Sequence, residues 1–394
     1  MKTCRKIVSF AVAVLMAVTC LTGLTACGSK DAWPTDKDGM TELLIGGIGP
    51  TTGGYSNYGL SVQHGAEIAV RKINEMGGVN GFKFVLEFED SQADPASAVA
   101  AYGKLMDNGM KVSLGAVLSG ETASVVKEAE ADKILVLTPS ASSMAAIAGN
   151  DCAFRVCFND PYQGVAAAQY VTRYNLGTKV AVFYGSDNDY CVGLYENFKA
   201  ECEKSGVEIV SVQTFTADTS TDFSTQINAI KASGADLVFL PIYAEEASSF
   251  LTQAAGKLDG VRCFGCDGLD GLLGKLGNNT ANAEGVLMLT PFTADDTGSA
   301  TAEFVSAYKA AYGAVPDQFA ADAYDAVFAI AEALKTAKLT SEDKDDFNTR
   351  IVGAMTKIKV SGLTGEMSWT KDGEVAKDAK LMEFKGGKVV AYTK

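Results

Sequence analysis

The sequence contains a single histidine in 394 residues, His64, and this scarcity excludes most histidine-dependent chemistry. A Ser–His–Asp triad would need this one ring beside a reactive serine, and no G-x-S-x-G segment is present to supply one. A zinc site needs three or four cysteine or histidine ligands, so the lone C-x-x-C of Cys263 and Cys266 is too small a set. His64 falls within a helical stretch, where packing is the more common role. We therefore expect no catalytic residues and no metal ligands.

Phosphate-binding motifs are also missing. A dinucleotide fingerprint counted from Gly47 needs glycine at position 52, but the segment GGIGPTTGG has Thr52 there, and Pro50 interrupts the turn. No Gly-Lys pair is followed by serine or threonine, which excludes a P-loop. Basic residues are few as well, with 34 lysines and arginines against 48 aspartates and glutamates. Because nucleic-acid binding depends on neutralising phosphates with basic side chains, we expect no nucleic-acid partner, and no cofactor.

The first 26 residues have the features of an export signal. Three basic residues precede the apolar run IVSFAVAVLMAV, which is too short for a stable membrane span. The run ends in LTAC, followed by glycine, and this resembles the bacterial lipobox, in which the cysteine is lipidated. We expect a signal peptide at 1–26, a lipid on Cys27, a polar tether at 27–40, and an extracytoplasmic protein anchored to the cell membrane. Without the signal the chain has 31 basic and 48 acidic residues, a net charge of −17.

Six cysteines lie beyond the lipobox: Cys152, Cys157, Cys191, Cys202, Cys263 and Cys266. Export permits disulfides. The first two lie roughly 16 Å apart if a strand separates them, and the next two lie about as far apart along a helix. Since a disulfide needs Cα atoms within roughly 7 Å, neither pair closes on itself. Cys263 and Cys266 are near enough to pair, and the connectivity stays open.

Short apolar runs alternate with helical stretches along the globular part, beginning with ELLIGGIG and a helix from about Leu60 to Met76. This alternation predicts βαβ units with parallel sheets, and about 355 residues are too many for one core. We expect an α/β protein with two Rossmann-like lobes that meet near FRVCFNDPYQG. A long helix over 318–335 and a β-rich end with turns at 371–373 and 386–387 complete the chain.

In such folds ligands bind beyond the carboxyl ends of the strands, near helix N-termini. The side chains at these places are Ser119, Ser140 and Ser142 in the first half, and Tyr190, Tyr243 and Asp267 in the second. Free N–H groups and hydroxyls at a helix N-terminus hold a carboxylate, whereas an ammonium is held by a carboxylate and aromatic rings. The set predicts a zwitterion site. Each residue taken alone also has a structural explanation, because serines cap helices, tyrosines pack at rims and aspartates form turns.

Several longer segments occur in a distinctive order. They are GPTTGGYSNYG, GAEIAVRKINEMGGVNG, FEDSQADPASAVAAYGKLMDNGMKVSLGAVLSGET, ILVLTPSAS, FRVCFNDPYQG and DAYDAV. From about Glu42 to its end the chain resembles the solute-binding lipoproteins of ATP-binding-cassette (ABC) importers, specifically the type I leucine/isoleucine/valine-binding family. The resemblance implies a type I periplasmic-binding-protein fold, with two Rossmann-like lobes joined by a three-crossover hinge. Lobe 1 would be 41–158 plus 292–362, and lobe 2 would be 159–291 plus 363–394.

The resemblance also implies a function. A monomeric, non-enzymatic receptor would capture an amino acid, branched-chain or otherwise apolar, and deliver it to the permease subunits of an ABC importer with cytoplasmic ATPases. Two alternatives remain: a ligand-sensing receptor of the same fold for an amide, an aromatic or another small solute, and a secreted serine hydrolase. The single histidine argues against the hydrolase.

By the same resemblance each site residue has a role. The α-carboxylate contacts would be Ser119, Ser140, Ala141 and Ser142. The aromatic contacts would be Tyr58, Tyr190, Tyr243 and Phe319, and Asp267 would bind the α-ammonium. Family members often carry glutamate at the position of Asp267 and threonine at that of Ser142. Aspartate and serine at these positions can still bind the ammonium and the carboxylate of an amino acid. The identity of the ligand side chain stays open.

Overall fold

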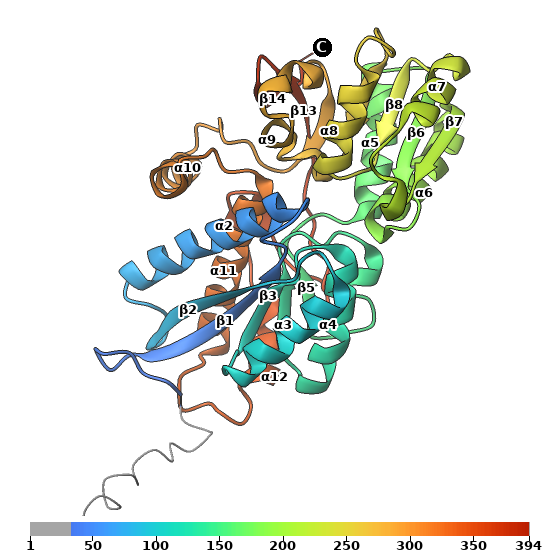
Figure 1. Ribbon diagram of the computed structural model, residues 1–394. Helices are drawn as coiled ribbons and strands as arrows, with labels where there is room; N and C mark the ends of the chain where they lie inside the picture. Colours follow the sequence, from blue (N-terminus) through green and yellow to red (C-terminus); the bar gives the residue numbers. More distant parts are fainter. Residues whose placement is uncertain (1–32, 394) are drawn as a thin grey trace, which may run out of the picture.

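The computed structural model of the protein describes residues 33–393. The predicted signal peptide, Cys27 and the first part of the tether therefore lie outside the described residues. Figure 1 shows two lobes, each with its own twisted sheet and flanking helices. The alternation of strands and helices expected from the sequence is confirmed. Within the described residues, none of the helices is long and apolar enough to cross a membrane.

The first sheet has five parallel strands in the order β2-β1-β3-β4-β5. They are β1 (Thr41–Gly49), β2 (Phe82–Asp90), β3 (Val112–Gly115), β4 (Leu135–Thr138) and β5 (Ala153–Arg155). The connecting helices are α2 (Ser56–Glu75), α3 (Pro95–Asp107) and α4 (Ser119–Asp132). Every residue of β3 and β4 is buried, as expected for parallel strands covered on both faces.

The second sheet has seven strands in the order β14-β13-β10-β9-β8-β6-β7. Its parallel part is β6 (Lys179–Gly185), β7 (Glu208–Phe215), β8 (Leu237–Leu240), β9 (Arg262–Gly265) and β10 (Leu287–Thr290). These five strands repeat the arrangement of the first sheet. The helices are α5 (Asp160–Tyr174), α6 (Asp189–Ser205), α7 (Ser224–Ser233), α8 (Ala244–Ala254) and the short α9 (Leu272–Leu276).

The C-terminal quarter of the chain adds elements to both lobes. They are α10 (Ser299–Tyr312), α11 (Gln318–Ala337), α12 (Phe347–Met355), the small β11 (Val360–Gly362) and β12 (Gly365–Met367) pair, and the antiparallel β13 (Lys380–Lys385) and β14 (Lys388–Ala391). The predicted long helix is α11. It packs closely on α2, where a Cβ at Gly65 would lie 2.0 Å from the Ala320 carbonyl oxygen. The predicted turn at Gly386 and Gly387 joins β13 to β14, and both glycines have positive φ.

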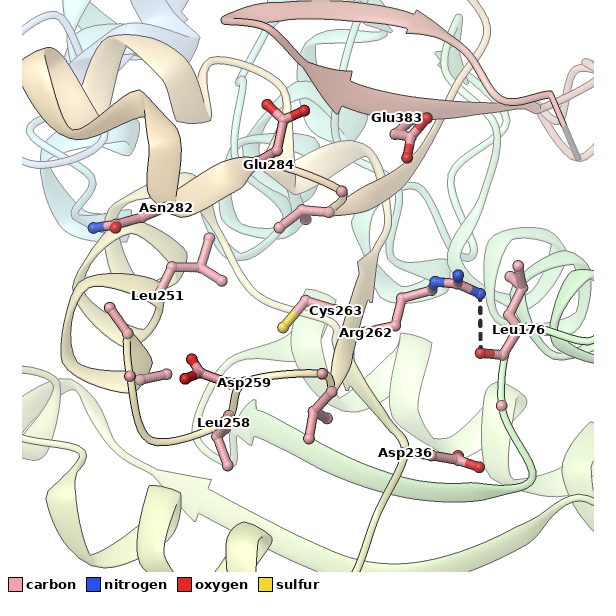
Figure 2. Close-up of a pocket in the computed structure, with 18 of the residues that line it drawn as sticks. Leu176, Asp236, Leu251, Leu258, Asp259, Arg262, Cys263, Asn282, Glu284 and Glu383 are labelled. Atoms are coloured by element: carbon pink, nitrogen blue, oxygen red, sulfur yellow. Dashed lines mark hydrogen bonds between the residues drawn. The ribbon is translucent and has the colours of Figure 1, made fainter.

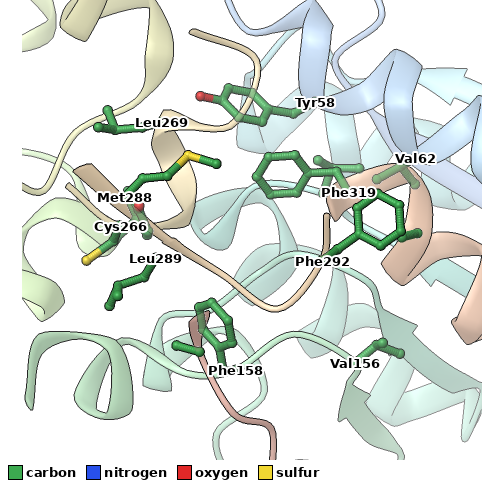
Figure 3. Close-up of a cluster of buried hydrophobic side chains, with 14 of the residues drawn as sticks. Tyr58, Val62, Val156, Phe158, Cys266, Leu269, Met288, Leu289, Phe292 and Phe319 are labelled. Carbon is green, nitrogen blue, oxygen red and sulfur yellow. The ribbon is translucent and has the colours of Figure 1, made fainter. Parts of the chain in front are cut away.

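Three segments of the chain cross between the lobes: 156–159, 291–298 and 368–379. The first two carry buried rings, Phe158 and Phe292, into an apolar cluster to which both lobes contribute side chains (Figure 3). Tyr58 and Phe319 enter this cluster from the first lobe, and Met288 enters it from the second. Apolar packing thus anchors the first two crossovers.

All six cysteines within residues 33–393 are free thiols. The close pair Cys263 and Cys266 does not form the disulfide that its spacing permits. Burial raises the pKa of the Cys263 thiol to about 12, which lowers its reactivity because the thiolate is the nucleophile.

Candidate functional site

A small cavity lies between the lobes, at the carboxyl ends of strands from both sheets. Its empty volume is about 270 Å³. The lining residues are Tyr58, Val117, Leu118, Ser119, Ser140, Ser142, Tyr190, Tyr243, Asp267, Gly268 and Phe319. Eight of the nine residues selected from the sequence are among them. The ninth, Ala141, is buried in the loop beside the cavity, where its N–H donates to Thr138 Oγ1 and its carbonyl accepts from Arg155.

The first-lobe wall is built by the segments that follow β3 and β4. The helix α4 begins at Ser119, so the positive end of its dipole lies at the cavity. The Ser119 hydroxyl accepts the Ser143 N–H at 3.2 Å, and the Ser140 hydroxyl donates to the Val117 carbonyl at 2.6 Å. Two adjacent loops are therefore bonded into one rigid wall of neutral polar groups.

Ser142 contributes a free donor to this wall. Its carbonyl accepts the Asp160 N–H at 3.0 Å, whereas within residues 33–393 its own N–H forms no hydrogen bond. A buried N–H without a partner is rare in proteins and costs free energy unless a ligand or water satisfies it. The amide and hydroxyl of Ser142 are thus placed to bind an anionic group in the cavity.

The second-lobe wall carries a carboxylate held by a tyrosine. Asp267 is only 2% exposed, and its Oδ1 accepts the Tyr190 hydroxyl at 2.8 Å. The Asp267 N–H donates to Gln163 Oε1 at 3.1 Å, which fixes the backbone. Burial raises the pKa of the Asp267 carboxyl to about 7, and the bonds from Tyr190 and Gln163 oppose part of that rise. An ammonium in the cavity would favour the ionised form of Asp267.

A second buried carboxyl group, Asp160, lies behind this wall at the start of α5 and is 1% exposed. Neither of its oxygens bonds to another described residue. Burial raises the pKa of Asp160 well above its usual range, while the nearby Ser142 hydroxyl lowers it. Asp160 does not line the cavity, so Asp267 is the carboxyl group that faces it.

The remaining wall is apolar. Phe319 packs edge-on against Tyr58 with ring centroids 5.0 Å apart, and Val117 and Leu118 complete this end. The Tyr58 hydroxyl donates to the Gly268 carbonyl at 2.7 Å and accepts the Ala244 N–H at 2.8 Å. Both bonds cross between the lobes, so Tyr58 helps to hold the cavity closed. Its hydroxyl proton is used in the bond to Gly268 and is not available to a ligand.

Other contacts close the lobes around the cavity. At the rim the Tyr55 hydroxyl donates to Glu246, and Lys275 contacts both the Gly54 carbonyl and Glu245. Burial raises the pKa of Glu246.

Deeper in the boundary, Asp270 Oδ2 accepts the Gln318 N–H at 2.9 Å, next to Asp317, the N-cap of α11. Burial and the charge of Asp317 raise the pKa of Asp270. Closure thus brings two carboxyl groups together at the N-terminus of one helix.

His64 lies away from the serine cluster. Its ring stacks on Tyr312 with centroids 3.7 Å apart, and its Nδ1 lies 3.4 Å from the Tyr308 hydroxyl. No group of three or more potential metal-binding side chains was found among residues 33–393. The packing role expected for His64 is the one the structure shows.

A larger depression lies at the opposite end of the second sheet (Figure 2). It is formed by the segments that precede β6, β8, β9 and β10, so it faces the amino ends of the strands. Arg262 there bonds to the Leu176 carbonyl at 3.1 Å, and the surrounding acids include Asp259 and Glu284. Ligands of such sheets bind at the carboxyl ends, which favours the interlobe cavity as the functional site.

Sequence reasoning missed Val117, Leu118 and Gly268, although each lies within two residues of a predicted position. Extending every predicted position by two residues on each side would have found them. The structure explains why glycine stands at position 268, because a Cβ there would lie 2.5 Å from the Tyr190 hydroxyl oxygen. Tyr55 follows the first strand, at the same edge of the sheet as the predicted residues. Glu246 and Asp270 have no comparable local signal, since they act across the lobe boundary.

Comparison with known proteins agrees with this geometry. A family model described as periplasmic binding protein matches residues 42–388. The Leu/Ile/Val-binding protein homolog 3 of Brucella melitensis is 34% identical over 206 residues, and this match spans 52% of the chain and 55% of that relative. The Leu/Ile/Val-binding protein BraC3 of Rhizobium johnstonii is 27% identical over 352 residues, which cover 89% of the chain and 94% of that protein.

Among solved structures, the branched-chain amino acid transporter substrate-binding protein LivJ of Streptococcus pneumoniae, in complex with isoleucine, superposes with a TM-score of 0.81 at 28% identity. The superposition covers 89% of this chain and 98% of that one. With a family match over nearly the whole globular part and the same two-lobe fold, the chain belongs to the periplasmic binding protein family.

Proposed function

We propose that the protein is an extracytoplasmic solute-binding protein of an ABC importer that captures an apolar amino acid between its lobes and delivers it to the permease. The observation that carries the proposal is the polarity of the cavity. Free and neutral donors around Ser142 form one wall, and the Asp267 carboxyl group lies on the other. This arrangement complements the carboxylate and the ammonium of one amino acid.

The ligand side chain is expected to be apolar and small. The far end of the cavity presents Phe319, Val117 and Leu118, and the Tyr58 hydroxyl is already bonded to two backbone groups. The cavity is small, with an empty volume of about 270 Å³. An aromatic acid without an amino group would leave Asp267 unpaired, which disfavours it as the ligand.

The proposal extends to location and partners. The lipobox-like LTAC supports a lipid on Cys27 and anchoring to the membrane, with residues 27–40 as the tether. The expected lobes are 41–158 plus 292–362 and 159–291 plus 363–394. Because a boundary at 362 would divide the paired strands β11 and β12, we place the third boundary in the crossover at 368–379. We expect a monomer that performs no catalysis, because the receptor needs only to close on its ligand and open at the permease.

Thermal unfolding with each of the twenty amino acids tests the proposal. The chain from Gly28 to Lys394 is first unfolded and refolded, which removes carried-over ligand. An amino acid at about 100 times its dissociation constant adds about 2.7 kcal/mol to the free energy of unfolding. A clear rise in Tm for aliphatic amino acids supports the proposal. If no amino acid raises Tm, the cargo has been misassigned.

A further inference from the structure

The loop that follows β4 is held in shape from behind. Arg155 Nη1 donates to the Ala141 carbonyl at 2.9 Å, and Nη2 donates to the Ser143 carbonyl at 3.0 Å. The carbonyl between them, that of Ser142, accepts the Asp160 N–H. Three successive carbonyls are therefore turned toward β5 and α5.

This orientation determines where the N–H groups of the loop point. A trans peptide places its C=O and its N–H on opposite sides. Holding the Ala141 carbonyl at Arg155 directs the free Ser142 N–H to the other side. Holding the Ser142 carbonyl likewise directs the Ser143 N–H toward Ser119, which lines the cavity. One guanidinium thereby orients the donors on which the proposed carboxylate site depends.

Arg155 is itself positioned by the third crossover. It is fully buried, its N–H donates to the Gly373 carbonyl at 3.0 Å, and its carbonyl accepts the Trp369 Nε1–H at 2.7 Å. A buried guanidinium stays charged and needs a counterion. Glu374 supplies one, with Oε1 3.2 Å from Arg155 Nη2.

Glu374 also reaches the second lobe. Its Oε2 accepts the Asn159 Nδ2–H at 2.9 Å, and Asn159 is the N-cap of α5, accepting the Tyr162 N–H. The carboxylate of Glu374 therefore links three places in the molecule: the crossover it belongs to, the arginine behind the serine loop, and the first helix of the second lobe.

We propose that Arg155 is a positioning residue for the ligand carboxylate and that Glu374 connects this residue to the hinge. The inference rests on the proposed function, since it assigns the serine loop to an amino-acid carboxylate. In this arrangement the third crossover affects affinity without touching the ligand. Movement of the hinge changes the pairing of Glu374, which in turn changes how Arg155 holds the loop.

The test uses E374Q, because replacing the buried arginine itself risks misfolding. Glutamine keeps an acceptor for Asn159 but removes the charge that pairs with Arg155. The matched control is E366Q, the same change at an exposed glutamate of β12. With L-leucine as the probe, E374Q is expected to weaken binding about tenfold, equivalent to about 1.4 kcal/mol. E366Q should stay within about twofold of the parent.

Amide hydrogen exchange in the ligand-free protein distinguishes positioning of the serine loop by Glu374 from a general effect of Glu374 on the fold. Faster exchange confined to residues 140–143 in E374Q, with unchanged exchange elsewhere, supports positioning of the loop. Unchanged exchange in this loop, or an equal rise throughout the molecule, overturns the inference. If the parent fails to bind any amino acid, the proposed function fails, and the exchange experiment still decides whether Glu374 orders the loop.

Discussion

The two walls of the cavity differ in how far their polar groups are satisfied within the protein. On the first-lobe wall most polar groups are already satisfied within the protein, since Ser140 bonds to Val117 and Ser119 accepts from Ser143. On the second-lobe wall Asp267 is buried with a tyrosine hydroxyl as its bonded partner, and its raised pKa shows that its charge is poorly compensated. The first wall offers a ligand neutral donors such as the free Ser142 N–H, whereas the second presents a buried carboxyl group whose charge needs a partner.

This difference indicates how the energy of binding is distributed. A neutral donor that is lost costs about 0.5–1.5 kcal/mol. A buried charge that loses its partner costs several times more. The second wall should therefore provide most of the affinity, and the first wall should orient the ligand. Changes to the two walls should differ in size accordingly.

The largest effect is expected for D267N, which keeps the shape of the side chain and removes its charge. Breaking a buried ion pair costs about 3–5 kcal/mol, so affinity for the amino acid should fall at least about 100-fold. Ligand-free D267N should unfold at a higher temperature than the parent at pH 8, because an uncompensated buried charge has been removed. Calorimetric titration and thermal unfolding measure the two effects.

The control for this change is D189N, at an exposed aspartate that begins α6 in the same lobe. It should leave both affinity and Tm near the parent values. Binding by D267N within threefold of the parent would show that Asp267 does not contact the ammonium.

A second effect concerns pH. The pKa of Asp267 is raised to about 7 in the empty folded protein, so the charged form is disfavoured there. The stability of the ligand-free protein should fall as pH rises from about 4 to about 7. A bound ammonium keeps Asp267 ionised and removes that loss. The ligand-induced gain in unfolding free energy should therefore grow by up to about 1.4 kcal/mol per pH unit and level off above pH 7.

Thermal unfolding between pH 5.5 and 8.5, with and without ligand, measures this dependence. In D267N the gain should no longer vary with pH over this range. If the ligand-induced gain in unfolding free energy of the parent protein is constant, or greatest at low pH, the assignment of Asp267 to the ligand ammonium is contradicted.

The same two walls show what sequence alone could establish. Strands such as β4 and the long helix α11 were predictable because their apolar patterns are local. The serines and Asp267 were found because the carboxyl ends of parallel strands converge on one edge. The start of α2 was misplaced, at about Leu60 where the helix begins at Ser56, because Tyr55 provides no side-chain cap as a signal.

Contacts between the lobes were beyond sequence reasoning. Tyr58 bonds to groups 186 and 210 residues away, and Tyr55 bonds to Glu246 across 191 residues. Such contacts depend on how the crossovers orient the lobes, and no local pattern encodes that orientation. The role of Arg155 was hidden for the same reason, since its partner Glu374 lies on a distant crossover.

A smaller effect separates two hydroxyls of the first wall. S142A removes a hydroxyl that lines the cavity and lies beside Asp160, so it should weaken binding about fivefold and lower Tm less than S140A does. S140A removes the bond to the Val117 carbonyl, so it should lower Tm while weakening binding less. Parallel titration and thermal unfolding distinguish the two. Equal losses of affinity would mean that both hydroxyls contact the ligand directly.

The smallest effect is expected at the rim, where residues of the two lobes contact each other but do not line the cavity. Y55F removes the bond to Glu246, which exists only while the lobes are closed, so it should speed ligand dissociation about threefold and leave association unchanged. Y195F is the control, since this ring stacks on Tyr184 within the second lobe. Stopped-flow fluorescence separates the two rates. The opposite result, slower association of the ligand with Y55F and unchanged dissociation, would contradict this expectation. It would mean that the contact between Tyr55 and Glu246 forms before the lobes close, and that the two cavity walls alone hold the closed state.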